Sequence, residues 1–275
     1  LRFPRIILAF LAGAGLSLSG AVLQTVTRNP LADPYLFGIS SGASFGAVLV
    51  IASVGAASSM VSITGGAFLG GALSVLLVVS LAGMGVQIER MLLAGVAVQF
   101  MFSSATSLVL YLSDPQAAAS LLFWILGSFT RASWDNLLLP FVVITFCLLV
   151  FLAFTRPLRA ILAGDESAKA LGVEVYRLRI GMLLLSSLLT ATLVASCGGI
   201  GFVGLMVPHI VRRILINHSQ YTLIGSAVFG GIFMIWVDVL ARMLMENSEL
   251  PVGVITAAMG SMFFLLVLKR RTAST

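Results

Sequence analysis

Charged side chains are scarce in this chain, making up only 9% of its 275 residues against about 25% in a typical soluble domain. Hydrophobic residues make up 59%, and the mean hydropathy is +1.11. Apolar runs of about eighteen or more residues recur along the whole length, and each is long enough to cross the hydrocarbon core of a bilayer as a helix. This composition excludes a soluble globular domain and indicates an all-α integral membrane protein.

Cysteine, histidine and lysine are also rare, with two of each. Cys147 and Cys197 lie in apolar stretches, where buried small side chains are expected rather than a disulfide. The cysteines and histidines form no ligand cluster, so no metal site is expected. Neither Lys169 nor Lys269 stands in a G-x-x-x-x-G-K-[ST] motif, which excludes an ATP site in this chain. A membrane-embedded enzyme is disfavoured as well, because no nucleophile, base or metal constellation is present and no catalytic residue is assigned.

What is present is a series of apolar segments that predicts nine crossings of the membrane. A further apolar element, 117–129, is too short to span. An odd number of crossings places the two termini on opposite sides. The predicted crossings are 6–27, 36–53, 60–83, 90–112, 136–155, 175–197, 200–216, 222–244 and 251–268.

The basic residues indicate which side is which, because short cytoplasmic loops collect Lys and Arg. Four of the 16 fall on one side: Arg2, Arg5, Arg131 and Arg242. The remaining twelve fall on the other side, which is therefore predicted to be cytoplasmic and to hold the C-terminus, while Leu1 is external. The net charge of +6 reflects this topology, so no nucleic-acid partner is expected.

Small residues stand where helices are expected to pack closely. Gly38, Gly42 and Gly46 form a continuous GxxxGxxxG, and Gly66 with Gly70 forms another such pair. These glycines predict a tight bundle. His209, next to Pro208, is expected to be a packing residue beside a proline kink rather than a metal ligand.

A polar island at 164–179 interrupts the apolar pattern. Asp165, Glu166 and Ser167 precede a short helical stretch, 168–171, which Gly172 ends, so the segment has helix start and stop signals. Two interpretations remain open: a compact cytoplasmic helix that docks a soluble partner, or a solvated loop helix with no further role.

Two sets of polar residues lie within the predicted spans. Gln99, Ser103, Thr106 and Ser107 share one helix face, which either lines a pathway or makes hydrogen bonds between helices. Asp238, Arg242 and Glu246 also share a face near the external end. They form either a compensated triad or, through Asp238, the coupling site of an ion-driven secondary transporter.

Arg2 and Arg5 oppose the charge bias at the mouth of the first span, and Arg242 is predicted to project to the same side. These arginines reach either lipid headgroups or a soluble external partner that offers carboxylates.

The motifs resemble a known family. The opening LRFPRIILAFLAGAGLSLSGAVLQTVTRNPLADPYLFGISSGASFGA, and the later RMLLAGVAV, GDESAKALGV, GGIGFVGLMVPHIVRR, DVLARM and ELPVGVITAAMGSMFFLLVLKR, resemble, in order, the permeases of type II ABC importers for iron-siderophores, haem and cobalamin. The resemblance covers essentially the whole chain, 1–275, as one transmembrane permease domain.

The resemblance implies a ten-helix subunit that works as a homodimer with two cytoplasmic ABC ATPases and a periplasmic or extracellular binding protein, in the plasma membrane of a bacterium or archaeon. ATP and Mg would be bound at the partner ATPase and no cofactor by this chain. The cargo is expected to be a siderophore, haem or cobalamin, or an oxyanion such as molybdate.

The resemblance also assigns residues. It implies that Glu166 to Gly172, namely Glu166, Ser167, Ala168, Lys169, Ala170, Leu171 and Gly172, together with Asp165, form the coupling helix seated in the ATPase. Arg2, Arg5 and Arg242 resemble the arginines that meet glutamates of the binding protein. The span holding Gln99 to Ser107, the element 117–129 and the last span resemble the elements lining the translocation path.

The chain departs from the family in two places. Nine spans with an external Leu1 imply that the family's first helix precedes the printed residues, in which no signal peptide is expected. The link at 83–89 is also shorter than the family's, so either this loop is short or residues are missing from it.

Overall fold

The structure is a computed structural model, and it describes residues 2–54, 60–83, 88–113, 118, 122, 124–215, 219–245 and 249–272. Within them the secondary structure is helical, with two 3-10 turns. The prediction of an all-α bundle is confirmed. The elements are α1 (Arg2–Val26), η1 (Pro34–Phe37), α2 (Ile39–Val54), α3 (Met60–Ala82), α4 (Ile88–Leu112), η2 (Trp134–Asn136), α6 (Leu138–Ala153), α7 (Thr155–Leu162), α8 (Asp165–Ala170), α9 (Val175–Cys197), α10 (Val203–Ile214), α11 (Ser219–Met243) and α12 (Val252–Thr272).

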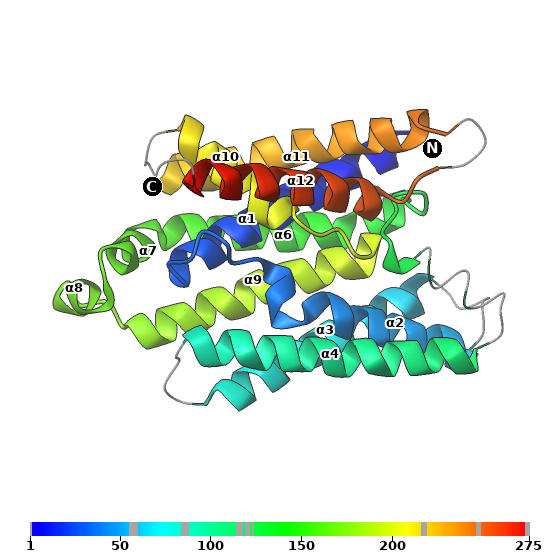
Figure 1. Cartoon of the computed structure of the whole chain (residues 1–275), viewed down its shortest axis with the longest axis horizontal. Helices are drawn as coiled ribbons and strands as arrows, with labels where there is room; N and C mark the ends of the chain where they lie inside the picture. The colour runs from blue at the N-terminus through cyan, green and yellow to red at the C-terminus, as the bar shows by residue number, and fades with distance from the viewer. Residues whose placement is uncertain are drawn as a thin grey trace.

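Each predicted crossing contains a helix, and six helical segments are long and apolar enough to span a bilayer. They fall in α1, α3, α4, α6, α9 and α11. The helices run roughly parallel or antiparallel along one axis, and the two termini lie at opposite ends of the bundle (Figure 1). This arrangement is that of a multi-pass membrane protein, and it agrees with the expectation that the two termini lie on opposite sides.

The centre of the bundle is formed by α1 and α9, which are largely buried, whereas less than half of the spanning window of α3, α4, α6 and α11 is buried. Large apolar side chains such as Phe146 on α6 and Trp236 on α11 cover these outer faces. Apolar outer faces of this kind are stable against lipid or against another apolar protein surface, as expected of a membrane protein.

The glycine pattern places α2 directly against α3. A Cβ added to Gly42 would lie 2.5 Å from the carbonyl oxygen of Gly70, and one added to Gly46 would collide with the carbonyl of Gly66. Any side chain there would force the two backbones apart. The predicted close packing is confirmed, and the two glycine motifs prove to be partners.

Two of the predicted spans are shorter than expected because their helices begin inside the bundle. The segment 200–216 forms a helix only at α10, whose 12 residues rise about 18 Å, too little to cross alone. Gly204, in its first turn, lies beside Leu16 of α1. Similarly α2 starts only at Ile39, after η1, and Gly38 lies against Ser74 and Gln99 in the middle of α3 and α4.

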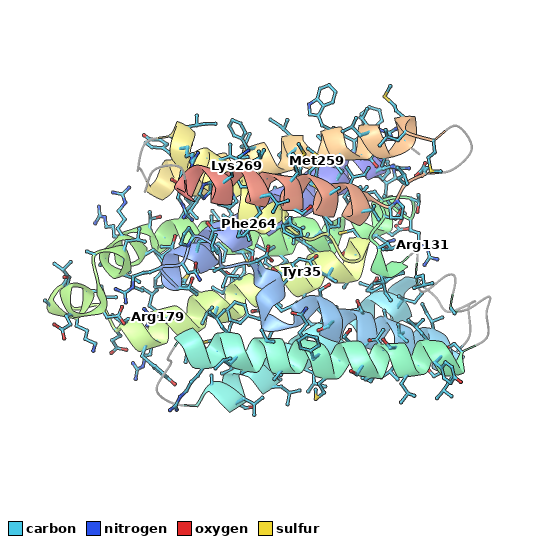
Figure 2. The ribbon with its side chains drawn as sticks, in the orientation of Figure 1. Tyr35, Arg131, Arg179, Met259, Phe264 and Lys269 are labelled. Carbon is cyan, nitrogen blue, oxygen red and sulfur yellow. The ribbon has the colours of Figure 1, made fainter. Side chains whose placement is uncertain are left out.

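The two interrupted regions meet each other. The hydroxyl of Tyr35, in η1, accepts a hydrogen bond of 2.7 Å from the backbone N–H of Ile200, in the loop before α10. Tyr35 lies near the middle of the bundle (Figure 2). Non-helical backbone at membrane depth is stable only where protein or a polar cavity satisfies its polar groups, so this contact marks a polar centre within an apolar protein.

Candidate functional site

The polar stripe on α4 lines a central cavity. Gln99, Ser103, Thr106 and Ser107 all border the same space of about 360 Å³, so the expectation that they share one face is confirmed. Three serines of α2 complete the polar wall together with Tyr35: Ser40, Ser41 and Ser44. Sequence reasoning missed these serines, although the ISSGAS stretch places them on the same helix as the glycine motif.

The hydroxyls of this wall are largely occupied within their own helices. Thr106 donates to the carbonyl of Phe102 at 2.8 Å, and Ser107 donates to that of Ser103 at 3.0 Å. Their oxygens still accept hydrogen bonds. The residues lining the cavity carry no formal charge, so the cavity offers many weak polar contacts and no strong ionic one.

The end of the predicted short element lies between this cavity and α12. Ile125 borders the cavity, and the carbonyls of Leu126 and Gly127 accept hydrogen bonds of 3.1 Å from the backbone N–H groups of Gly253 and Val252, at the start of α12. Much of the element 117–129 lies outside the described residues. Its described end is hydrogen-bonded to the start of α12.

At one end of the bundle α8 protrudes beyond the other helices (Figure 1). The predicted short helix is present, but it runs from Asp165 to Ala170 rather than over 168–171, so the acidic residues form its first turn instead of preceding it. Gly172 follows it, as predicted, with a φ of +79°, a backbone conformation that favours glycine. Ala168 is fully buried and holds the helix against its neighbours. The remaining predicted coupling residues are exposed: Glu166, Ser167, Lys169, Ala170, Leu171 and Gly172.

Asp165 points the other way and fastens α8 to the bundle. Its two carboxylate oxygens accept hydrogen bonds of 3.0 and 3.2 Å from Arg179 of α9, and Arg28, just after α1, lies 3.3 Å away. Arg179 in turn donates to the carbonyl of Val26, at the end of α1, at 3.0 Å. The hydrogen bonds from Arg179 lower the pKa of Asp165, assisted by the charge of Arg28. The resemblance grouped Asp165 with the coupling residues that meet the ATPase, whereas in the structure it connects α8 to α1 and α9.

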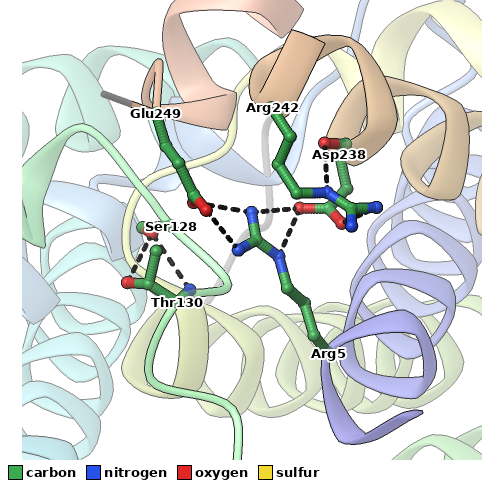
Figure 3. Close-up of polar contacts among 6 residues, drawn as sticks. All are labelled: Arg5, Ser128, Thr130, Asp238, Arg242 and Glu249. Carbon is green, nitrogen blue, oxygen red and sulfur yellow. Dashed lines mark hydrogen bonds and ion pairs between the residues drawn. The ribbon is translucent and has the colours of Figure 1, made fainter. Parts of the chain in front are cut away.

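A second charged cluster lies at the opposite end, where Asp238 of α11 is held between two arginines. Arg5 Nε donates to Asp238 Oδ1 at 2.8 Å, and Arg242 Nη2 lies 3.1 Å from Oδ2 (Figure 3). Arg5 also reaches both carboxylate oxygens of Glu249, at 2.8 and 2.9 Å. The two arginines and two carboxylates compensate each other. We call these four residues the Asp238 network.

The Asp238 network shows that Arg5 and Arg242 differ in exposure and in their ion pairs. The predicted pairing of Asp238 with Arg242 is present, but Arg5 is only 14% exposed and is already engaged, while Arg242 is 34% exposed. Asp238 itself is 1% exposed.

Some predicted residues lie outside the part of the chain that the structure describes. They are Glu246, the third member predicted for the triad, the side chain of Arg2, and residues 84–87 of the short link at 83–89. Glu249 was missed because its link to Arg5 joins opposite ends of the sequence.

The remaining candidates have structural roles. The ring of His209 packs edge-on against Phe263 of α12, with 5.7 Å between centroids, which confirms a packing role. Cys147 and Cys197 are buried free thiols. Among the described residues, no group of three or more His, Cys, Asp or Glu side chains comes together to hold a metal ion.

The chain matches a known protein family over nearly its whole length. The model of the FecCD transport family matches residues 1–270. This chain belongs to the FecCD transport family. The resemblance noted in the sequence is thereby confirmed, and it extends to nearly every described element.

Individual relatives of this FecCD chain agree with the assignment. It is 39% identical to the Fe(3+)-citrate import system permease protein YfmD of Bacillus subtilis, covering 98% of this chain and 80% of that one. It is 37% identical to the hemin transport system permease protein HmuU of Yersinia pestis, covering 98% and 83%. A solved ABC transporter, described as of metal-chelate type in an inward-facing conformation, superposes with a TM-score of 0.91 at 34% identity, covering 98% of this chain and 86% of that one.

Proposed function

We propose that this FecCD chain is the membrane permease of an ABC importer and that it moves a metal chelate, or an oxyanion such as molybdate, by ATP-driven alternating access. In this proposal two copies form the pathway, two ATPases bind the cytoplasmic end and a binding protein delivers cargo outside. The observation that carries it is α8: a short helix, fixed from behind by Asp165 and exposed along its outer face, at one end of a bundle with a polar centre.

The proposed role of α8 is to transmit motion from an ATPase that binds ATP and Mg. A helix that is to pass a displacement on must be exposed to its partner and firmly joined to the membrane helices. Exposed Lys169 and Leu171 supply the first condition, and the Asp165 pairs with Arg179 and Arg28 supply the second. The end that carries α8 is then cytoplasmic, together with the C-terminus.

Charge reversal tests this role with a matched control. Lys169→Glu, on the exposed face of α8, should reduce copurification of the ATPase and abolish ATP-dependent uptake. Arg131→Glu changes the same amount of charge on an exposed residue at the opposite end of the bundle and should leave the ATPase bound. If the complex that carries Lys169→Glu binds the ATPase and takes up cargo like the unmodified protein, the proposal is wrong.

At the other end we propose that the binding protein docks on the end of the bundle that carries Arg2, Arg5 and Arg242. Support comes from the exposed part of Arg242 and from Arg131, which is exposed at the same end of the bundle (Figure 2), since charge pairs at an exposed surface guide encounter and orientation. Because Arg5 is engaged with Asp238 and Glu249, its proposed contribution is to hold that surface in place. Arg242→Gln should slow association with the binding protein at low salt, whereas Lys269→Gln, near the C-terminus, should leave it unchanged.

The proposed path passes the central cavity lined by Gln99, Ser103, Thr106 and Ser107. A neutral polar wall suits this role because cargo must not be held strongly on its way through. The same property means that the wall does not select one cargo, so selection is expected to rest on the binding protein. The cargo is best identified from the ligand that the partner binding protein retains on purification.

The alternative, a secondary transporter that couples ions at Asp238, gains no support from the geometry. Asp238 is buried, and both of its oxygens face arginines, which occupy the place of a coupling cation. Proteoliposomes holding the complete importer should therefore show no uptake under a proton or sodium gradient when ATP is omitted. Gradient-driven uptake without ATP favours the alternative.

A further inference from the structure

A small pocket unrelated to the central cavity opens near the α8 end of the bundle. Its volume is about 100 Å³, and it lies between α1, α7, α10 and α11. Two arginines, Arg159 and Arg212, contribute to its wall together with three threonines: Thr25, Thr155 and Thr222. The remaining wall is apolar: Ala21, Leu158, Leu162 and Leu223. A space of this size accommodates a phosphate group and little more.

Arg212 is fixed in place by a neutral partner. Its Nη2 donates to Gln24 Oε1 at 2.7 Å, and the Gln24 amide donates to the carbonyls of Gly204 and Leu205 at 3.2 and 3.3 Å. In the described part of the chain no carboxylate pairs with Arg212. A guanidinium has five N–H donors, so most of the donors of Arg212 remain for a ligand. Its positive charge is partly buried and uncompensated by an acidic side chain.

The threonine hydroxyls in the wall are neutral, so they do not cancel the charge of Arg212. Thr25 donates its hydroxyl to the carbonyl of Ala21, and Thr155 donates to that of Leu152. Their hydroxyl protons are therefore directed into the helices. The charge that the pocket presents comes from Arg212 and from Arg159, whose side chain borders the same space, and it favours an anion.

The surroundings of the pocket match the boundary between headgroups and acyl chains. The short helix α7 is amphipathic, with Leu158 and Ile161 buried and Arg156 and Arg159 exposed. Leu162, on the rim, is 52% exposed, and the outer faces of α6 and α11 beside it are apolar. A free ion needs no apolar rim, whereas a lipid places its glycerol and first methylenes there. Basic pockets between membrane helices at this depth are suited to anionic lipids.

We propose that this pocket binds the phosphate group of an anionic phospholipid, with Arg212 and Arg159 as its ligands and the Leu162 rim against the acyl chains. The site joins α7, which leads into α8, to α10 and α11. Occupancy therefore couples the lipid composition of the membrane to the segment that carries the proposed coupling helix.

The test uses the complete importer complex, purified in a neutral detergent and depleted of lipid. Dioleoylphosphatidylglycerol or dioleoylphosphatidylcholine is added, and the lipids retained by the complex are counted by native mass spectrometry. We expect selective retention of phosphatidylglycerol. Arg212→Gln and Arg159→Gln should each weaken it about fivefold, the factor that corresponds to one basic side chain at an anionic surface.

Arg156→Gln is the matched control, since Arg156 is an exposed arginine on the same helix that does not line the pocket. It should retain phosphatidylglycerol like the unmodified protein. Arg159 is exposed, so Arg159→Gln carries the test even if Arg212→Gln misfolds. Equal retention of the two lipids, or equal loss in Arg156→Gln, overturns the proposal. If millimolar inorganic phosphate displaces phosphatidylglycerol, the occupant of the pocket is a free ion and the proposed lipid site is wrong.

Discussion

The two ends of the bundle use the same chemical device in different ways. At each end one aspartate is held by two arginines: Asp165 by Arg28 and Arg179, and Asp238 by Arg5 and Arg242. Asp165 belongs to a helix of six residues that protrudes from the bundle, and its side chain is 33% exposed. Asp238 is part of the long helix α11 and is 1% exposed.

The difference lies in what each aspartate connects. The Asp165 pairs join α8, a helix of only six residues, to the ends of two central helices. They leave the outer face of α8 open to a partner. The Asp238 network joins α1, α11 and the residues before α12 to each other, and it is neutral once Glu249 is included. We infer that the first arrangement passes a displacement on, while the second holds the helices in register.

The largest effect is expected from Asp238→Asn, because it leaves two partly buried arginines facing a neutral amide. Removing one partner of a buried ion pair costs about 3 kcal/mol or more, since the remaining charge stays desolvated. The variant should therefore unfold at a clearly lower temperature in detergent, as followed by the thermal melting of the purified complex.

Asp135→Asn is the control for this change, because Asp135 is exposed and should tolerate the loss of its charge. A melting temperature of Asp238→Asn equal to that of Asp135→Asn would show that the network adds nothing to stability, and the contrast between the two ends would disappear.

A smaller and different effect is expected from Asp165→Asn. Its site is partly exposed, so the protein should remain folded and bind the ATPase, while α8 loses its connection to α1 and α9. Coupling free energies between sites correspond to changes of about 5- to 150-fold, and we expect ATP-driven uptake per assembled complex to fall about tenfold.

Glu174→Gln provides the comparison for that variant, since Glu174 is an exposed carboxylate close to α8 whose ion pair among the described residues is with the exposed Arg177. Uptake should be unchanged in Glu174→Gln. Undiminished uptake in Asp165→Asn, measured with equal amounts of bound ATPase, contradicts a transmitting role for this aspartate.

The pH dependence at the α8 end follows from the lowered pKa of Asp165. A carboxylate whose folded pKa is depressed contributes its stabilisation fully above the unfolded value of about 3.9 and loses it as the pH falls through the folded pKa. A spin label on Leu171→Cys, which is exposed on α8, should therefore show constant mobility from pH 7 to pH 5 and greater mobility only below about pH 4. In Asp165→Asn the label should be mobile throughout, and a transition near neutral pH in the unmodified background argues against this assignment.

Several of these features follow from local patterns in the sequence. Long apolar runs predict where the helices lie. A spacing of three and four residues predicts that the polar residues of α4 share one face. Acidic residues followed by a glycine predict the short helix α8. The glycine motifs predicted close packing because that property depends only on residue size. Such patterns act within one helix, where geometry is fixed by the backbone.

What the sequence did not predict depends on contacts between distant segments. Arg5 and Glu249 are 244 residues apart, and Arg179 reaches the carbonyl of Val26 across 153 residues. The starts of α2 and α10 inside the bundle were missed because hydropathy does not distinguish an apolar loop from an apolar helix. Tyr35 meets Ile200 only once both breaks are present.

The smallest effect is expected at the central cavity, which differs from both ends in having no charge on its wall. Ser103→Ala removes one hydroxyl, and a hydrogen bond of this kind within a membrane protein contributes about 0.6 kcal/mol, or roughly threefold. The bond from Ser107 survives, because it is made to the backbone carbonyl of Ser103. Uptake into proteoliposomes, with cargo supplied on the binding protein, should therefore change by less than about threefold. A loss comparable to that of Asp165→Asn would mean that the cavity holds its cargo at a specific site, because a path made of many weak and interchangeable contacts tolerates the loss of any one of them.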